Sequence, residues 1–134
     1  MINIRETGEF VINIVTESIA QQMSGCAENY PPATSEFTET GLTPVPATVV
    51  KAPMVAESPV NMECKLLQII PLPESEYTVA MGQVVMFHVA PDLFVGDGRI
   101  DSARLAAVGR MAGNTYASTR ELFSMQYDSF TQIK

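Results

Sequence analysis

Histidine and cysteine are scarce in this 134-residue chain, which contains one histidine, His88, and two cysteines, Cys26 and Cys64. These residues have no spacing typical of metal ligands, and a structural zinc site needs about four such ligands. The scarcity argues against a structural metal centre. Two cysteines without a disulfide framework also favour a reducing compartment such as the cytosol.

Basic residues are also few: eight lysines and arginines stand against 15 aspartates and glutamates, which gives a net charge of −7. Such a charge disfavours binding to nucleic acid and to anionic membrane surfaces. No apolar run approaches the ~20 residues of a membrane-spanning helix. The opening, Met1 to Glu6, is too polar for a signal peptide. We therefore expect a cytoplasmic protein.

Apolar residues, in contrast, make up 46% of the sequence, and the mean hydropathy is +0.12. This composition is typical of a globular protein and argues against disorder. A length of 134 residues gives room for one hydrophobic core. We expect a single domain over residues 1–134.

Two apolar runs, 59–70 and 77–89, predict a long antiparallel hairpin. A polar segment at 71–76 with two prolines and two acids separates them and suits a solvated turn. The first run begins with alternation that places Val60, Met62 and Cys64 on a core face and Asn61, Glu63 and Lys65 in water. The middle of the second run, 84–87, has the apolar character of a strand buried on both faces. The sequence therefore indicates a mostly β fold with short helices.

The remaining pattern predicts short elements around this hairpin. Residues 3–8 resemble the last turn of a helix that ends at Gly8, and 9–15 form an apolar strand. Thr16 is a candidate N-cap for a helix over 17–23. Further expected elements are a helix near 35–39, a short strand at 49–50, a turn at Asp97 and Gly98, and a helix over 101–107 capped by Asp101 or Ser102.

His88 has two interpretations. It is either a proton donor or partner for a nicotinamide or flavin ring, or a strand residue hydrogen-bonded to a neighbour; without a telling partner in sequence the second is favoured. Glu57, just before the first long strand, either binds a ligand at the sheet edge or caps the turn. Cys64 fits a small buried hydrophobe, and nothing near Cys26 lowers a thiol pKa.

The segment 109–114, Gly-Arg-Met-Ala-Gly-Asn, offers exposed backbone amides beside a guanidinium. That combination suits a phosphate or an electron-rich ring. The segment lacks the Lys-Ser/Thr pair of a P-loop and is no dinucleotide fingerprint, and glycines beside an arginine also make ordinary turns.

An ordered series of motifs nevertheless resembles the flavin reductase-like family. The series is Asn3–Asn13, Tyr30–Pro32, Glu36-Phe37, Gly41–Thr43, Ala56–Val60, Glu63-Cys64, Gly82–Val85 and Gly109-Arg110 with Gly113–Tyr116. The resemblance implies an FMN-binding split β-barrel and a homodimer with FMN between subunits. It further implies that Arg110, Gly113, Asn114 and Tyr116 approach the flavin, with Glu57 and His88 as further, catalytic candidates.

By the same resemblance, the chain corresponds to the C-terminal two-thirds of such a domain, without the first barrel strands and most of the FMN grip. An incomplete barrel, weakened FMN binding and self-association through uncovered apolar surface are the resulting expectations. The implied activity is reduction of FMN by NAD(P)H. The alternatives are an FMN-binding electron carrier without a nicotinamide site, and a truncated remnant that no longer binds flavin.

Overall fold

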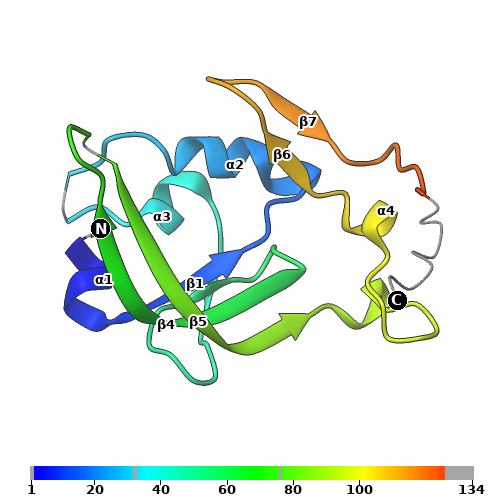
Figure 1. Ribbon diagram of the computed structural model, residues 1–134, viewed down its shortest axis with the longest axis horizontal. Coiled ribbons are helices and arrows are strands. Elements are labelled where there is room, and N and C mark those ends of the chain that lie inside the picture. Colours follow the sequence, from blue (N-terminus) through cyan, green and yellow to red (C-terminus); the bar gives the residue numbers. More distant parts are fainter. Residues whose placement is uncertain (1, 32, 76, 126–134) are drawn as a thin grey trace, which may run out of the picture.

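The largest sheet is three-stranded and antiparallel, in the order β1-β4-β5. It consists of β1 Glu9–Asn13, β4 Val60–Pro71 and β5 Thr78–Val89. The computed structural model describes residues 2–31, 33–75 and 77–125 (Figure 1). Pro32 of the Tyr30–Pro32 motif, Glu76 of the predicted turn and residues 126–134 lie outside the described residues. The long hairpin predicted from the two apolar runs is confirmed.

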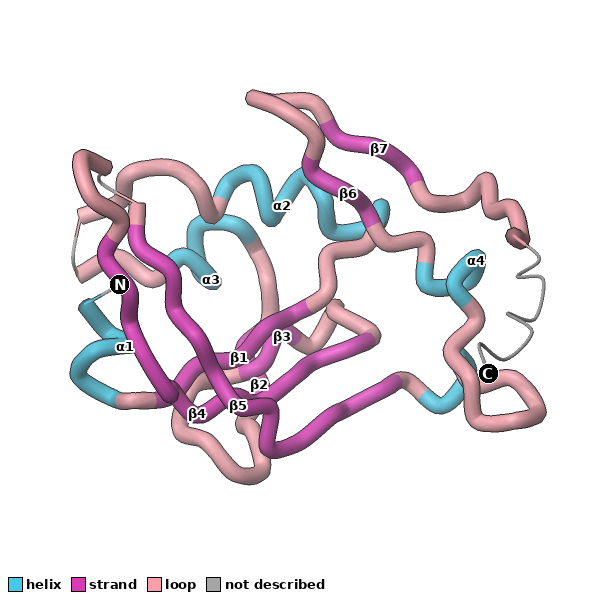
Figure 2. Tube along the Cα trace, in the orientation of Figure 1, coloured by secondary structure: helices cyan, strands magenta, loops and turns pink. Residues whose placement is uncertain are grey.

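Short elements surround this sheet and two small antiparallel pairs accompany it, β2 with β3 and β6 with β7. Their bounds are α1 Ile2–Thr7, η1 Glu17–Ile19, α2 Ala20–Gly25, α3 Glu36–Thr40, β2 Pro44–Val45, β3 Met54–Val55, η2 Pro91–Leu93, α4 Ser102–Leu105, β6 Val108–Arg110 and β7 Tyr116–Ser118. The three sheets share no strand pairing. Figure 2 shows the β6–β7 pair apart from the long sheet, and the described residues form an open arrangement rather than a closed barrel. The mostly β fold with short helices is therefore confirmed.

Several helix ends follow the predicted chemistry. Gly8 ends α1 with a φ of 67°, and its N–H donates to the carbonyl of Ile4 at 3.0 Å. Asp101 caps α4, because its carboxylate accepts from the N–H groups of Ala103 and Arg104. Within the described residues, no helix is long and apolar enough to cross a membrane.

The prediction that Thr16 caps the following helix is wrong. Thr16 has extended backbone geometry, but its hydroxyl makes no capping hydrogen bond. That hydroxyl instead lies 2.8 Å from Oγ of Ser18. Thr16 also forms a bridge with Ala107, so it joins the end of β1 to the segment before β6.

The prediction that Asn61 and Glu63 face water is also wrong. Asn61 is 7% exposed and Glu63 is 0% exposed, as deeply placed as Cys64 at 1%. β4 is the central strand of the sheet, and the segment 48–50 lies over the side chain of Glu63. The alternation of apolar and polar residues therefore distinguished the two faces of β4, but it did not show that both faces are covered by other parts of the chain.

The prediction of a strand at 49–50 is also wrong, because this segment covers Glu63 and does not pair with a strand. Residues 48–52 form a bend, and the short strands of this region are β2 and β3 on either side of it. The N–H groups of Val49 and Val50 donate to the carboxylate of Glu63 instead of a strand partner. The carboxylate of Glu63 thus takes the place of the backbone carbonyls that a neighbouring strand would supply.

The expectation that 84–87 is buried on both faces is wrong as well. None of the four residues is buried, and Phe87 is 61% exposed. Among the described strands β5 pairs with β4 alone, so it is an edge strand. One feature of β5 is tightly packed: a Cβ added to Gly82 would lie 2.4 Å from Cζ of Phe10, so the ring occupies the space that a side chain would need.

Candidate functional site

A buried carboxylate, Glu63 on β4, organises the region that contains the candidate residues. Its oxygens accept from the N–H groups of Thr48 at 2.7 Å, Val49 at 2.6 Å and Val50 at 2.8 Å. The next N–H, that of Lys51, donates to Glu9 on β1 at 2.9 Å. Two carboxylates therefore hold four consecutive backbone amides against the sheet.

His88 on β5 completes the set of partners of Glu63, with Nε2 2.5 Å from Oε1 of the carboxylate. Burial raises the pKa of Glu63, but the hydrogen bonds from Thr48, His88 and the two following amides outweigh it and lower the pKa to about 2. Because Glu63 then carries no proton near neutral pH, we assign the ring proton to Nε2 of His88. His88 thus has the neighbouring partner that its structural interpretation expects.

Glu57, between β3 and β4, also has a partner within the protein. Both of its carboxylate oxygens accept from the N–H of Thr43, at 3.0 and 3.1 Å. Hydrogen bonds from Thr43 hold the pKa of Glu57 below its ordinary value. The carboxylate ties the segment before β2 to the start of β4, which fits the capping alternative.

The structure nevertheless brings Glu57 and His88 together at one surface pocket of about 480 Å³. The pocket lies at the end of the β4–β5 pair. Its lining comprises 56–59, Asn61 and residues 88–90 with Asp92. A second pocket of about 310 Å³ shares Glu57, Pro59 and Asp92 with it, so the two are neighbours along one cleft.

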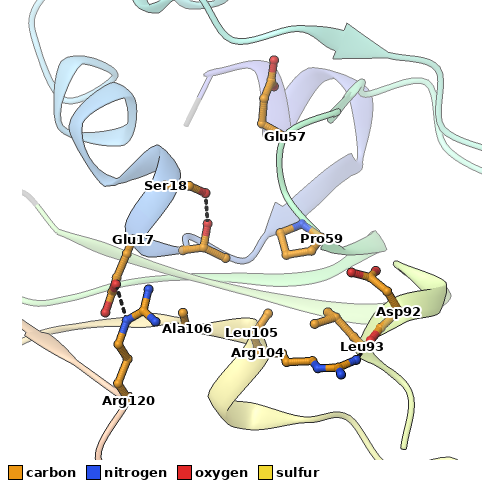
Figure 3. Close-up of a pocket in the computed structure, with 11 residues that line it drawn as sticks. Glu17, Ser18, Glu57, Pro59, Asp92, Leu93, Arg104, Leu105, Ala106 and Arg120 are labelled. Carbon is orange, nitrogen blue, oxygen red and sulfur yellow. Dashed lines mark hydrogen bonds and ion pairs between the residues drawn. The ribbon is translucent and has the colours of Figure 1, made fainter.

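The second pocket carries charges of both signs. Figure 3 shows Glu17 and Arg120 at one end of it and Asp92 and Arg104 at the other. Nε of Arg120 lies 2.6 Å from Glu17, and Nη1 of Arg104 donates to the carbonyl of Asp92 at 2.9 Å. Hydrogen bonds from Ser118 and Arg120 lower the pKa of Glu17.

Contacts of this region also hold the open end of the β6–β7 hairpin, where β6 begins and β7 ends. The hydroxyl of Ser118 donates to Glu17 at 2.5 Å, and that of Thr119 donates to the carbonyl of Ala107 at 2.7 Å. On the other strand, the N–H of Val108 donates to the carbonyl of Val15 at 3.0 Å. Both strands of the hairpin are therefore attached close to Ala106 and Arg120, which line the second pocket.

The four predicted flavin residues lie on this hairpin. Arg110 pairs with Tyr116 in the ladder, and Gly113, with a φ of 54°, occupies the turn between them beside Asn114. All four are exposed, and none of them lines either pocket. The structure thus groups Arg110, Gly113, Asn114 and Tyr116 with one another, and Glu57 with His88, as two separate sets.

The cysteines contribute no cluster. Cys64 is buried, which raises the pKa of its thiol, and Cys26 is half-buried near Thr40. Among residues 2–31, 33–75 and 77–125, no group of three or more histidine, cysteine or acidic side chains is placed to hold a metal ion.

Sequence reasoning missed Glu63, Asn61 and Arg120. Glu63 stands in an alternating strand, where an acid ordinarily marks the solvent face. The one signal was that Glu63 belongs to a motif that carries the family resemblance, since an acid between Met62 and Cys64 is itself the ordinary pattern of a strand with one solvated face. No local signal links Arg120 to Glu17, which is 103 residues away in sequence.

Comparison with known proteins places this fold. The sequence profile described as the flavin reductase like domain matches residues 1–103, which include β1, β4 and β5. The chain belongs to the flavin reductase-like family. Residues 104–134, with the β6–β7 hairpin, follow the matched region.

Individual relatives agree with this assignment. The chain is 38% identical to nitrilotriacetate monooxygenase component B from Bacillus cereus, with a TM-score of 0.85 over 92% of this chain and 62% of that one. It is 30% identical to a Shewanella frigidimarina protein with a split barrel domain, with a TM-score of 0.85 over 94% of this chain and 64% of that one. An uncharacterized protein of Halalkalibacterium halodurans is 38% identical over 136 residues, 97% of this chain and 64% of its own length. The chain therefore has the flavin reductase split-barrel fold in incomplete form, as predicted, and spans less than two thirds of the length of these relatives.

Proposed function

We propose that this protein is a cytoplasmic FMN-dependent oxidoreductase of the flavin reductase type, which reduces flavin with NAD(P)H. The observation that carries the proposal is the match of the flavin reductase like domain profile to residues 1–103. The proposal extends to this chain an activity that the family description names. The choice of FMN and of NAD(P)H rests on the family resemblance of the sequence motifs.

The β6–β7 hairpin fits a flavin mononucleotide by the chemistry of its groups. The guanidinium of Arg110 has one long hydrogen bond within the described residues, from Nη2 to the carbonyl of Gly113 at 3.4 Å. Its remaining N–H groups suit a phosphate or a carbonyl-rich ring edge. Tyr116 is 38% exposed and offers an aromatic face beside it, and Asn114 supplies a further amide.

When bound, the flavin supplies the redox chemistry, and the protein supplies position and electrostatics. In our proposal Arg110 and the turn at Gly113 bind the anionic part of the cofactor, while Asn114 and Tyr116 orient it. Glu57 and His88 are the candidates for contact with the reacting partner. Both line one pocket, where His88 is held in a fixed orientation by Glu63.

Anaerobic reduction tests this function directly. FMN mixed with the protein should lose its visible absorbance on addition of NADH or NADPH, faster than FMN with nicotinamide alone. Bound FMN that keeps its colour under both nicotinamides would support an electron carrier instead. Absence of any flavin binding at high FMN concentration would refute the proposal.

We also propose that the protein forms a homodimer. The outer part of the β4–β5 hairpin exposes large apolar side chains, including Leu67 at 64% and Met81 at 46%. β1 pairs with residues 61–65 of β4 alone, so within the described sheet the outer hairpin has no third strand. An uncovered apolar surface and an edge strand favour association with another chain.

Sedimentation velocity at micromolar concentration should therefore show dimers or larger species. The matched variants Leu67→Lys and Met81→Lys should shift the distribution toward monomer, because a charge at a buried contact is costly. The control Phe94→Lys, at a residue that is 49% exposed just after η2, should not. A stable monomer of the unchanged chain would count against this arrangement.

A further inference from the structure

The pocket lined by Glu57 and His88 contains a buried acceptor that has no partner. Asn61 on β4 is 7% exposed, lines this pocket, and has an Oδ1 atom buried without a hydrogen bond among the described residues. Buried polar atoms in folded proteins nearly always have a partner. An orphaned oxygen at a pocket wall therefore indicates that a donor is missing.

The orientation of the Asn61 amide identifies which atom is left over. Nδ2 donates to the carbonyl of Ser58 at 3.0 Å. Turning the amide by half a rotation would place Oδ1 against that carbonyl, with two acceptors in contact. The free group is thus an oxygen that accepts and not an N–H that donates.

His88 places a second acceptor at the same pocket. Asn61 and His88 are directly paired across β4 and β5. Since Nε2 of His88 donates to Glu63, the other ring nitrogen, Nδ1, has a free lone pair in the neutral ring. The imidazole side chain is 28% exposed, so it remains accessible from the pocket.

The charged residues of the pocket have one sign. Glu57 and Asp92 line it, and none of the described lysines and arginines does. Asp92 is exposed, and within the described residues its carboxylate makes no hydrogen bond or ion pair. The side chains that face this space therefore combine negative charge with unpaired acceptors.

We propose that this pocket binds a small organic cation of the amidinium or guanidinium class. Such a group carries several N–H donors in one plane, which suits two neighbouring acceptors such as Oδ1 of Asn61 and Nδ1 of His88. The carboxylate of Asp92 supplies charge at the rim. Oδ1 is buried, so a donor reaches it only if the side chains over it move. The site is separate from the flavin residues of the hairpin, but it is the pocket in which we propose that Glu57 and His88 contact the reacting partner. The inference itself does not rest on the proposed function.

Titration with benzamidinium, followed by NMR of the His88 ring nitrogens and the Asn61 side-chain amide, tests the site. Saturable shifts of both groups are expected. Asn61→Ala removes the orphaned acceptor and should weaken binding about tenfold. Asp92→Asn should weaken it about two- to fivefold, since an exposed pair contributes little. The matched control Asp97→Asn, an exposed aspartate outside the pocket, should leave the affinity unchanged.

Two results would overturn the proposal. One is the absence of saturable shifts at His88 and Asn61 at high probe concentration. The other is an equal effect of Asp92→Asn and Asp97→Asn, which would show non-specific attraction to a protein of net charge −7. If Asn61→Ala does not fold, the exposed Asp92 variant still decides between these outcomes.

Discussion

Replacement of Glu63 by alanine should lower the melting temperature of the protein by roughly 10 °C or more. Glu63 is 0% exposed and accepts from three consecutive backbone amides and from His88. Its removal leaves these buried donors without an acceptor and releases the segment 48–50 from the sheet. Thermal unfolding followed by circular dichroism measures the effect.

Glu6→Ala is the matched control, because Glu6 is an exposed acid on α1 and should change the melting temperature little. Glu63→Gln separates charge from shape: it keeps one acceptor oxygen and should be less damaging than alanine. A Glu63→Ala protein as stable as the unchanged chain would show that water satisfies the amides of 48–50 equally well.

The stabilising contribution of Glu63 should also appear in the pH dependence of the free energy of unfolding. The pKa of Glu63 falls from 4.5 in an unfolded chain to about 2 in the fold. A lowered pKa means that the contribution of Glu63 is complete above pH 4.5 and is lost as the pH falls toward 2. Urea unfolding across that window should therefore show a steeper loss of stability for the unchanged chain than for Glu63→Gln.

The case of Glu63 also shows what sequence reasoning can and cannot reach. The β4–β5 hairpin was predictable because a period of two and a proline-rich turn are local signals. The covering of the second face of β4 was not, because it depends on a segment that lies 13 to 15 residues before Glu63. An alternating acid is normally solvated, and only the tertiary structure shows that Thr48, Val49 and Val50 take the place of water.

The candidate site likewise has features that residue type predicts and features that only the tertiary structure shows. Glu57 and His88 could be singled out from residue type, but the pocket that they share requires the register of β4 against β5 and the position of η2. Asn61 has no sequence signal, since an asparagine in a strand is ordinarily a surface residue. The glycines of 109–114 indicated a turn or an anion site, but not the pairing of β6 with β7. The attachment of this hairpin to Glu17 is a contact between distant parts of the chain.

Arg110→Ala should weaken FMN binding about ten- to a hundredfold, and His88→Ala should weaken it less. A charged hydrogen bond contributes ~1.5–3 kcal/mol, and a tenfold change in affinity corresponds to ~1.4 kcal/mol. Arg110 is exposed and has one long hydrogen bond to the residues that the structure describes, so its guanidinium is available to an anionic cofactor. Nε2 of His88 is already hydrogen-bonded to Glu63. The ring therefore has less to offer a phosphate.

Fluorescence-quenching titrations with FMN should be made on this chain and on a longer one that also carries the part of the relatives' length that this chain does not cover. We expect weak binding by the present chain and tighter binding by the longer one, because several contacts add. Arg5→Ala, an exposed arginine on α1 far along the chain from the hairpin, is the matched control. If Arg110→Ala and Arg5→Ala reduce FMN affinity equally, the guanidinium of Arg110 acts only through the general charge of the protein, and the hairpin is not the flavin site.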